Sequence, residues 1–262
     1  MLRAWIERAR ERRSERALER QLDYQRAKAD ALTDDADELA RYRTMDALAV
    51  RAKLDAVRPI AEDARVLEVG SGPHGLVFFF GTTDAVGVDP LADEYARLFP
   101  QWQGRARTLR AFGESLPFDA GSFDIVLSDN CVDHARDPSA ILREISRVLR
   151  PGGLFYFSVN VHHGIYAAVS RLHGAWSAAG IGLEITPFAD HTVHLTLRQA
   201  QALFEGLPLR IVHERDSIAE TTRQSADIEV RQPLEHVKRL FFKNALYEVI
   251  AVRTGEAQAH DR

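Results

Sequence analysis

Cysteine is nearly absent from this sequence, which has a single one, Cys131, among its 262 residues. One cysteine excludes an internal disulfide framework and a cysteine-rich zinc site. Long apolar runs are lacking too, and no stretch approaches the roughly 20 apolar residues of a membrane-spanning helix. Met1 to Trp5 lead into charged residues rather than into an apolar signal core. We therefore expect a protein of the reducing cytoplasm.

An excess of positive charge is also lacking. Lysine and arginine number 34 against 38 aspartates and glutamates, which gives a formal net charge of −4. The sequence after residue 38 has no dense basic stripe with interleaved aromatic residues, so we expect no nucleic-acid partner. The length and the 45% share of apolar residues suit one folded α/β domain with additions.

Residues 1–38 are predicted to form a charged helical extension. From Glu7 onward, Glu-Arg pairs recur every four residues, which places opposite charges three residues apart on a helix. Large apolar side chains are few, with only Leu18 and Leu22 after Ile6. We expect a solvated helix with a thin apolar stripe, and we expect the rest of the chain to fold without residues 1–30. The alternative is a surface that docks a partner or an anionic membrane.

Residues 39–262 are predicted to form one α/β domain. A helix is expected over residues 39–60 and ends near Pro59. The apolar residues that recur there at helical spacing are Leu39, Tyr42, Met45, Leu48 and Ala52. Apolar strand-like runs then alternate with helix-like patterns such as Ser139–Leu149, as in a parallel sheet covered on both faces. The predicted strands are Arg65–Val69, Ala85–Asp89, Asp124–Ser128, Leu154–Val159, Leu209–Glu214 and Ala245–Arg253.

A glycine loop follows the first predicted strand. Gly70-Ser71-Gly72-Pro73-His74-Gly75 has the spacing G-x-G-x-x-G, in which glycines allow a sharp turn and close approach to a ligand. Asp89 ends the next strand, where a carboxylate can accept hydrogen bonds from ribose hydroxyls. Glu68 would repel a dinucleotide pyrophosphate but suits a ligand that carries an ammonium group. The alternative for Glu68 is an acid at the strand end that faces solvent.

The segment Val66-Leu67-Glu68-Val69-Gly70-Ser71-Gly72 resembles motif I of the class I S-adenosylmethionine-dependent methyltransferases. Later segments resemble that family in order and spacing: Val86–Pro90, Glu114–Asp119 with Ser122–Val126, Asp129–His134 and Leu149–Gly153. The resemblance covers about residues 60–160. It implies a Rossmann-like, doubly wound, mostly parallel seven-stranded sheet with an antiparallel C-terminal strand.

The resemblance also implies that the cofactor is S-adenosyl-L-methionine, bound with its methionine end on the glycine loop and its ribose on Asp89. Phe112 stands where many family members have an acid for the adenine amino group, so the backbone of the next two residues is expected to read the adenine. The residues assigned to the cofactor are Glu68, Gly70, Ser71, Gly72, Asp89, Pro90, Gly113, Glu114 and Asn130.

Histidines gather on the expected acceptor side. His134 follows the fourth strand of the family, while His162 and His163 follow the fifth, so all three are expected at the carboxyl edge of the sheet. Histidine has an unperturbed pKa of about 6.5 and can take a proton from an acceptor hydroxyl. The alternatives are that His134 caps a helix or packs on the cofactor, and that the pair has an ordinary structural use.

Residues 161–195 resemble the variable insert that covers the acceptor in this family. Asp190, His191 and His194 are plausible metal ligands together with His162 or His163. No carboxylate pair completes such a site, and we expect no metal. Cys131 is expected to pack, because direct displacement at a methyl group needs no enzyme nucleophile.

These features predict an enzyme that transfers a methyl group from S-adenosylmethionine to an acceptor. The expected acceptor is a hydroxyl of a sugar, a glycolipid or another small molecule. Two alternatives are a methyltransferase-like scaffold that binds the cofactor without catalysis and an NAD(P)-dependent oxidoreductase. A homodimer and peripheral membrane contact through the N-terminal helix are compatible with the sequence.

Overall fold

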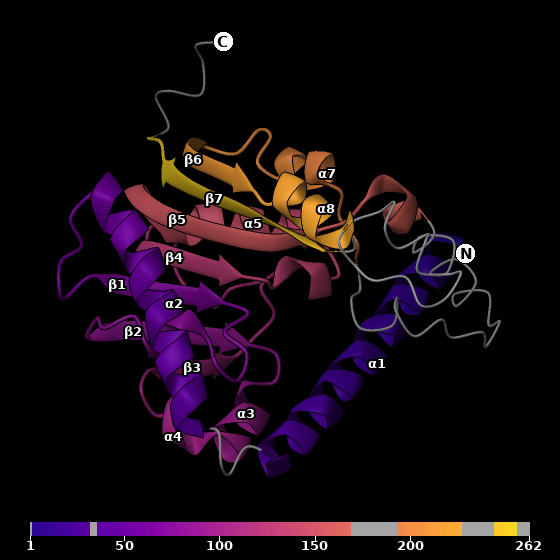
Figure 1. Cartoon of the computed structure of the whole chain (residues 1–262), viewed down its shortest axis with the longest axis horizontal. Helices are drawn as coiled ribbons and strands as arrows, with labels where there is room; N and C mark the ends of the chain where they lie inside the picture. The colour runs from indigo at the N-terminus through magenta and orange to yellow at the C-terminus, as the bar shows by residue number, and fades with distance from the viewer. Residues whose placement is uncertain (1, 32–35, 169–192, 227–243, 256–262) are drawn as a thin grey trace.

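The computed structural model describes residues 2–31, 36–168, 193–226 and 244–255, and its centre is one sheet (Figure 1). The strand order is β3-β2-β1-β4-β5-β7-β6. The first five strands are parallel, and β7 runs antiparallel to both β5 and β6. The predicted doubly wound sheet with an antiparallel C-terminal strand is therefore confirmed. The strands are β1 Arg65–Val69, β2 Asp84–Asp89, β3 Arg107–Arg110, β4 Phe123–Asp129, β5 Leu149–Val161, β6 Leu209–Asp216 and β7 Ala245–Arg253.

Helices cover both faces of the sheet. One core cluster joins the sheet to α2, η1 and α3, and the other joins it to α5 and α7. The helical elements are α1 Leu2–Ala31, α2 Ala36–Val57, η1 Leu76–Phe78, α3 Ala92–Leu98, α4 Pro100–Gln103, η2 Val132–His134, α5 Pro138–Val148, α7 Leu197–Ala202 and α8 Ile218–Ala226. In the described part of the chain, none of them is long and apolar enough to cross a membrane.

The central strands are apolar at successive positions because both of their faces are buried. In β1, Val66 joins the cluster under α2, whereas Leu67 joins the cluster under α5. In β4, Leu127 and Val126 divide between the two clusters in the same way. Continuous apolar runs are typical of parallel strands between two helical layers, and this is why the sequence predicted these strands closely.

Strand β3 is the strand that the sequence pattern did not reveal. It has four residues, Arg107–Arg110, and lies at the edge of the sheet beside β2. Its side chains are half-buried or exposed, with an arginine at each end. An edge strand with one neighbour needs no continuous apolar run, so hydrophobic patterning could not identify it.

Helix α2 forms where predicted, but the apolar stripe that predicted it is not its buried face. Ala47, Val50 and Leu54 pack into the core. The opposite side of the helix exposes 62% of Tyr42, 70% of Met45 and 53% of Leu48. Helical spacing therefore identified the helix, but its orientation is set by contacts with η1 and the sheet.

This orientation predicts unequal costs for the same substitution at two positions of α2. Leu54→Ala removes a fully buried side chain and should lower the free energy of unfolding by about 2–5 kcal/mol. Leu48→Ala, on the exposed side, should change it by less than about 0.5 kcal/mol. Urea unfolding of both variants measures the difference. Equal losses would show that the exposed stripe is buried in solution.

Candidate functional site

A cavity of about 400 Å³ lies where β1, β2 and β4 end at the carboxyl edge of the sheet. Ligands bind at this edge in open α/β sheets, and the volume is within the usual range for small-molecule sites. The nine residues that the sequence assigned to the cofactor all line it: Glu68, Gly70, Ser71, Gly72, Asp89, Pro90, Gly113, Glu114 and Asn130. The structure thus brings them together, whereas their contacts with a ligand stay a prediction.

The glycine loop turns so tightly that its first glycine touches the loop after β4. Gly70 has a φ of +75°, and a Cβ there would lie 2.3 Å from Sγ of Cys131. The N–H groups of Gly70 and Ser71 both donate to the carbonyl of Val88, at 2.8 and 3.1 Å. Only glycine fits this position, because a side chain would overlap the sulfur and strain the backbone. Burial also raises the pKa of the Cys131 thiol, in keeping with a packing role.

Glu68 is buried, with 1% of its surface exposed, so the alternative that it faces solvent is wrong. Its carboxylate accepts hydrogen bonds from the N–H groups of Leu76 (3.2 Å) and Val77 (2.8 Å) at the start of η1. Burial raises its pKa to about 8, and Asp129 adds to the shift, while the two N–H donors and Arg43 oppose it. Glu68 therefore holds the chain that leaves the glycine loop, a role that the sequence did not suggest.

Asp89 also connects the loop to the next strand. One carboxylate oxygen accepts the N–H of Gly72 at 3.0 Å, and the other accepts the N–H of Leu91 at 2.8 Å. Burial raises its pKa to about 6, and the nearby Glu94 contributes in the same direction. Each oxygen of an ionised carboxylate can accept a second hydrogen bond, so Asp89 can still serve a ligand.

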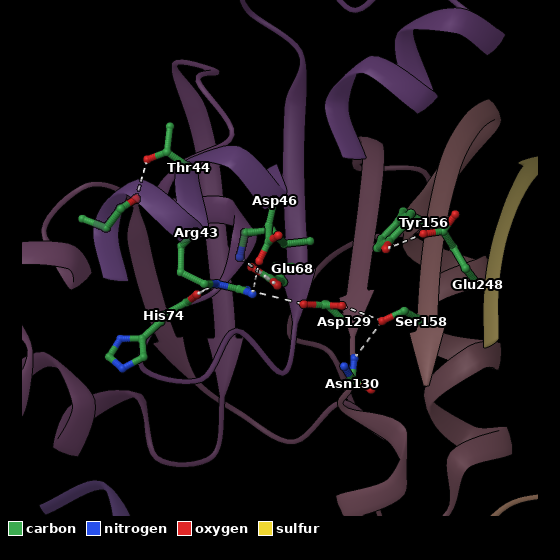
Figure 2. Close-up of polar contacts among 12 residues, drawn as sticks. Arg43, Thr44, Asp46, Glu68, His74, Asp129, Asn130, Tyr156, Ser158 and Glu248 are labelled. Atoms are coloured by element: carbon green, nitrogen blue, oxygen red, sulfur yellow. Dashed lines mark hydrogen bonds and ion pairs between the residues drawn. The ribbon is translucent and has the colours of Figure 1, made fainter. Parts of the chain in front are cut away.

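Arg43 on α2 is a site residue that the sequence analysis missed. Figure 2 shows its guanidinium between the glycine loop and the end of β4. It donates to the carbonyl of His74 (2.8 Å), to Asp46 (3.1 Å) and to Asp129 (3.4 Å). The other oxygen of Asp129 accepts the hydroxyl of Ser158. A single arginine in a helix far from the motif gives no sequence signal, because only the packing of α2 brings it to the cavity wall.

The loop after β4 carries the candidate acceptor-side residue His134. Asn130 turns this loop with a φ of +48°, and its N–H donates to the carbonyl of Ser158 at 3.1 Å. His134 then lines the cavity from η2, with 39% of its side chain exposed and Nε2 3.9 Å from a carboxylate oxygen of Asp133. It is thus accessible both to the cavity and to solvent.

His162 and His163 lie at the end of β5, as expected, but they are not among the described residues that line the cavity. The ring of His162 is buried and stacks on Tyr166, with 5.2 Å between ring centroids, and it lies 4.8 Å from His194. Nδ1 of His163 accepts the N–H of Ile165 at 3.3 Å. Most of the predicted insert, residues 169–192 with Asp190 and His191, lies outside the described residues.

Helix α1 contributes a wall of the cavity that the sequence analysis did not foresee. Its described residues Leu18 and Leu22, the predicted apolar stripe, pack against the core cluster on the α2 side of the sheet. The α1 residues that line the cavity are Ala17, Leu18, Gln21, Gln25 and Lys28. Their spacing of three or four residues was a usable signal, but the sequence could not say what this face would meet.

Comparisons with known sequences give the same family as motif I. A family profile described as a methyltransferase domain matches residues 67–157. A methyltransferase of Mycolicibacterium gilvum, described as uncharacterized, is 39% identical over 123 residues, which are 44% of this chain and 48% of that protein. The chain therefore spans less than half the length of the curated relatives it matches.

Solved structures share the fold. A putative methyltransferase of Bacillus halodurans superposes with a TM-score of 0.55 at 14% identity, over 78% of this chain and 99% of that one. A geranyl diphosphate C-methyltransferase of Streptomyces coelicolor, solved with geranyl diphosphate and S-adenosyl-L-homocysteine, gives 0.54 at 18% identity over 79% of each chain. The family match, the strand order and the glycine loop together identify residues 67–157 as a class I S-adenosylmethionine-dependent methyltransferase domain.

Proposed function

We propose that this chain binds S-adenosyl-L-methionine in the cavity and catalyses transfer of its methyl group to an acceptor. The observation that carries the proposal is that nine residues assigned from sequence, spread over residues 68–130, line one cavity at the carboxyl edge of the sheet. The polar and charged side chains that line the cavity fit this cofactor. Asp89 offers acceptors for ribose hydroxyls, Glu68 offers carboxyl oxygens that can accept hydrogen bonds from an ammonium, Asp129 offers negative charge to it, and Arg43 offers positive charge to a carboxylate.

The adenine would lie between Pro90 and the segment that begins at Phe112. Phe112 lines the cavity with a partly exposed ring, and the guanidinium of Arg136 lies 5.1 Å from that ring. A Cβ at Gly113 would lie 2.7 Å from Val69, so the backbone there is close to β1 and open to the cavity side. A flat aromatic wall with backbone hydrogen-bonding groups suits a purine even without an acidic residue at position 112.

Methyl transfer requires mainly orientation from the chain. When bound, the cofactor supplies an electrophilic methyl group on a sulfonium, whose displacement leaves S-adenosylhomocysteine. The cavity walls fix the ligand relative to the acceptor, and such positioning can account for much of a rate enhancement. His134 is the proposed base, because it is the one of the three candidate histidines that lines the cavity. It would take the proton that an attacking hydroxyl loses.

We propose a hydroxyl of a sugar, a glycolipid or another small molecule as the acceptor. A base is useful when the nucleophile is a hydroxyl, which carries a proton that must leave as the new bond forms, and His134 supplies one at the rim of the cavity. The net charge of −4 argues against nucleic acid.

The first test of the proposal is binding of S-adenosylhomocysteine, measured by calorimetry beside NADH and NADPH. We expect heat with the first ligand only. Asp89→Ala should weaken this binding by about 1–3 kcal/mol, the scale for losing a charged hydrogen-bond partner. Asp93→Ala, which replaces an exposed acid in the first turn of α3 that does not line the cavity, is the matched control. Unchanged affinity in folded Asp89→Ala would remove Asp89 from the site.

Affinity for S-adenosylhomocysteine should also depend on pH through Asp89. Because its pKa is raised to about 6, the carboxyl is mostly ionised at pH 7 and mostly protonated at pH 5. A protonated carboxyl accepts fewer hydrogen bonds from ribose hydroxyls, so the affinity should fall about tenfold from pH 7 to pH 5. Calorimetry at both pH values measures the change. The same fall in Asp89→Asn would assign the titration to another group.

Replacement of His134 should slow the reaction and spare cofactor binding. We expect His134→Asn to lower turnover by about 10²–10⁴-fold, the usual loss for a general base, with little change in affinity for S-adenosylhomocysteine. Release of S-adenosylhomocysteine across a panel of glycans, glycolipids and small hydroxyl compounds is the readout. His162→Asn and His163→Asn are the comparisons, and we expect His162→Asn mainly to lower the melting temperature, because that ring is buried. Full turnover in His134→Asn would place the base elsewhere.

The same experiments also test the two alternative functions. Cofactor binding without product from any acceptor class would favour the scaffold alternative over catalysis. Heat of binding with NADH or NADPH would favour the oxidoreductase alternative.

A further inference from the structure

Helix α1 turns one face toward the cofactor cavity and another toward solvent. The residues on the cavity face, Ala17, Leu18, Gln21, Gln25 and Lys28, follow one another at helical spacing. The exposed residues of the helix include Glu19 and the ion pair of Asp23 with Arg26 at 3.2 Å. In Figure 1, α1 is a long helix that passes α3 and stands apart from the sheet. A helix surrounded by solvent on all sides would not bury one of its faces in this way.

Two contacts fix the cavity face of α1 against the domain. Gln21 lies close to Tyr95 of α3, a residue that also lines the cavity. Leu18 packs into the core cluster on the α2 side of the sheet. These contacts hold the helix at the cavity wall, to which Gln25 also belongs.

Polar atoms on this side of the cavity lack partners within the described structure. Gln25 is 6% exposed, and its buried Oε1 has no hydrogen bond to any described residue. Both ring nitrogens of His74, on the glycine loop, are buried without a hydrogen bond to the described part of the chain. Burial and the positive charge of Lys28 lower the pKa of His74 to about 4, so its neutral ring offers one donor and one acceptor at pH 7.

Buried polar atoms without protein partners are uncommon and call for a ligand or an ordered water. We propose that α1 is part of the cofactor site: its Gln25, together with His74, hydrogen-bonds bound S-adenosylmethionine, and the helix closes the cavity over it. This inference rests on the proposed function. It makes the N-terminal extension a binding element, so a change on its cavity face should alter cofactor affinity without a change in the motifs themselves.

The test compares two substitutions two residues apart on α1 in the full-length chain. Gln25→Ala removes the cavity-facing amide and should raise the dissociation constant of S-adenosylhomocysteine about 2–10-fold, as expected for one hydrogen bond. Its dissociation rate should rise with it. Asp23→Ala, whose side chain is 74% exposed, is the matched control and should bind as the wild type does. Calorimetry and stopped-flow displacement measure the two quantities.

Hydrogen exchange of the wild-type chain gives a second readout that needs no variant. Amides of residues 15–29 should exchange more slowly once S-adenosylhomocysteine is bound, because the ligand holds the helix in place. Unchanged exchange together with wild-type affinity in Gln25→Ala would overturn the inference and leave the proposed function intact. Equal weakening by both substitutions would also overturn it. A wild-type chain that binds no S-adenosylhomocysteine would overturn the proposed function, and this inference with it.

Discussion

The close approach of the glycine loop to the loop after β4 is the constraint on which the site depends. Gly70 lies so near Cys131 that no side chain fits between them. Its N–H and that of Ser71 bind the end of β2, so three strand ends meet at one point. Glu68 then holds the outgoing chain by two backbone N–H groups. These contacts fix the position of the glycine loop, and the other elements that line the cavity pack around it.

Charge in the cavity is balanced by elements that lie far apart in sequence. Two buried carboxylates, Glu68 and Asp89, have raised pKa values because they are removed from water. Asp129 adds negative charge nearby, and Arg43 from α2 binds it and opposes its effect on Glu68. Burying acids beside one another is costly unless hydrogen bonds and an opposite charge offset it. The position of α2 is therefore part of the electrostatics of the site.

The sequence alone determined the sheet and the centre of the site. Apolar runs in parallel strands are long because both faces are buried, so β1, β2 and β4 were predicted with small errors at their ends. For β5 the apolar part was predicted, but the strand begins at Leu149, within the segment that was predicted to be a turn. The glycine loop and Asp89 could be found because a tight turn and a strand-end acid impose residue types at fixed spacing. The short edge strand β3 escaped, since a strand with one neighbour and exposed arginines carries no such pattern.

The tertiary structure decided which faces of the helices meet the cavity and which meet solvent. Helical spacing on α2 pointed to Tyr42 and Met45, yet packing against η1 buries Val50 and Leu54 instead and turns Arg43 toward Asp129. On α1, the spacing of residues could not distinguish a solvated helix from a cavity wall. The neighbours of Gln25 along the chain are the same whether its side chain meets solvent or lines the cavity, as it does here. The sequence determines local periodicity, which depends on neighbours along the chain. Orientation depends on contacts between residues far apart in sequence, and these exist only once the chain has folded.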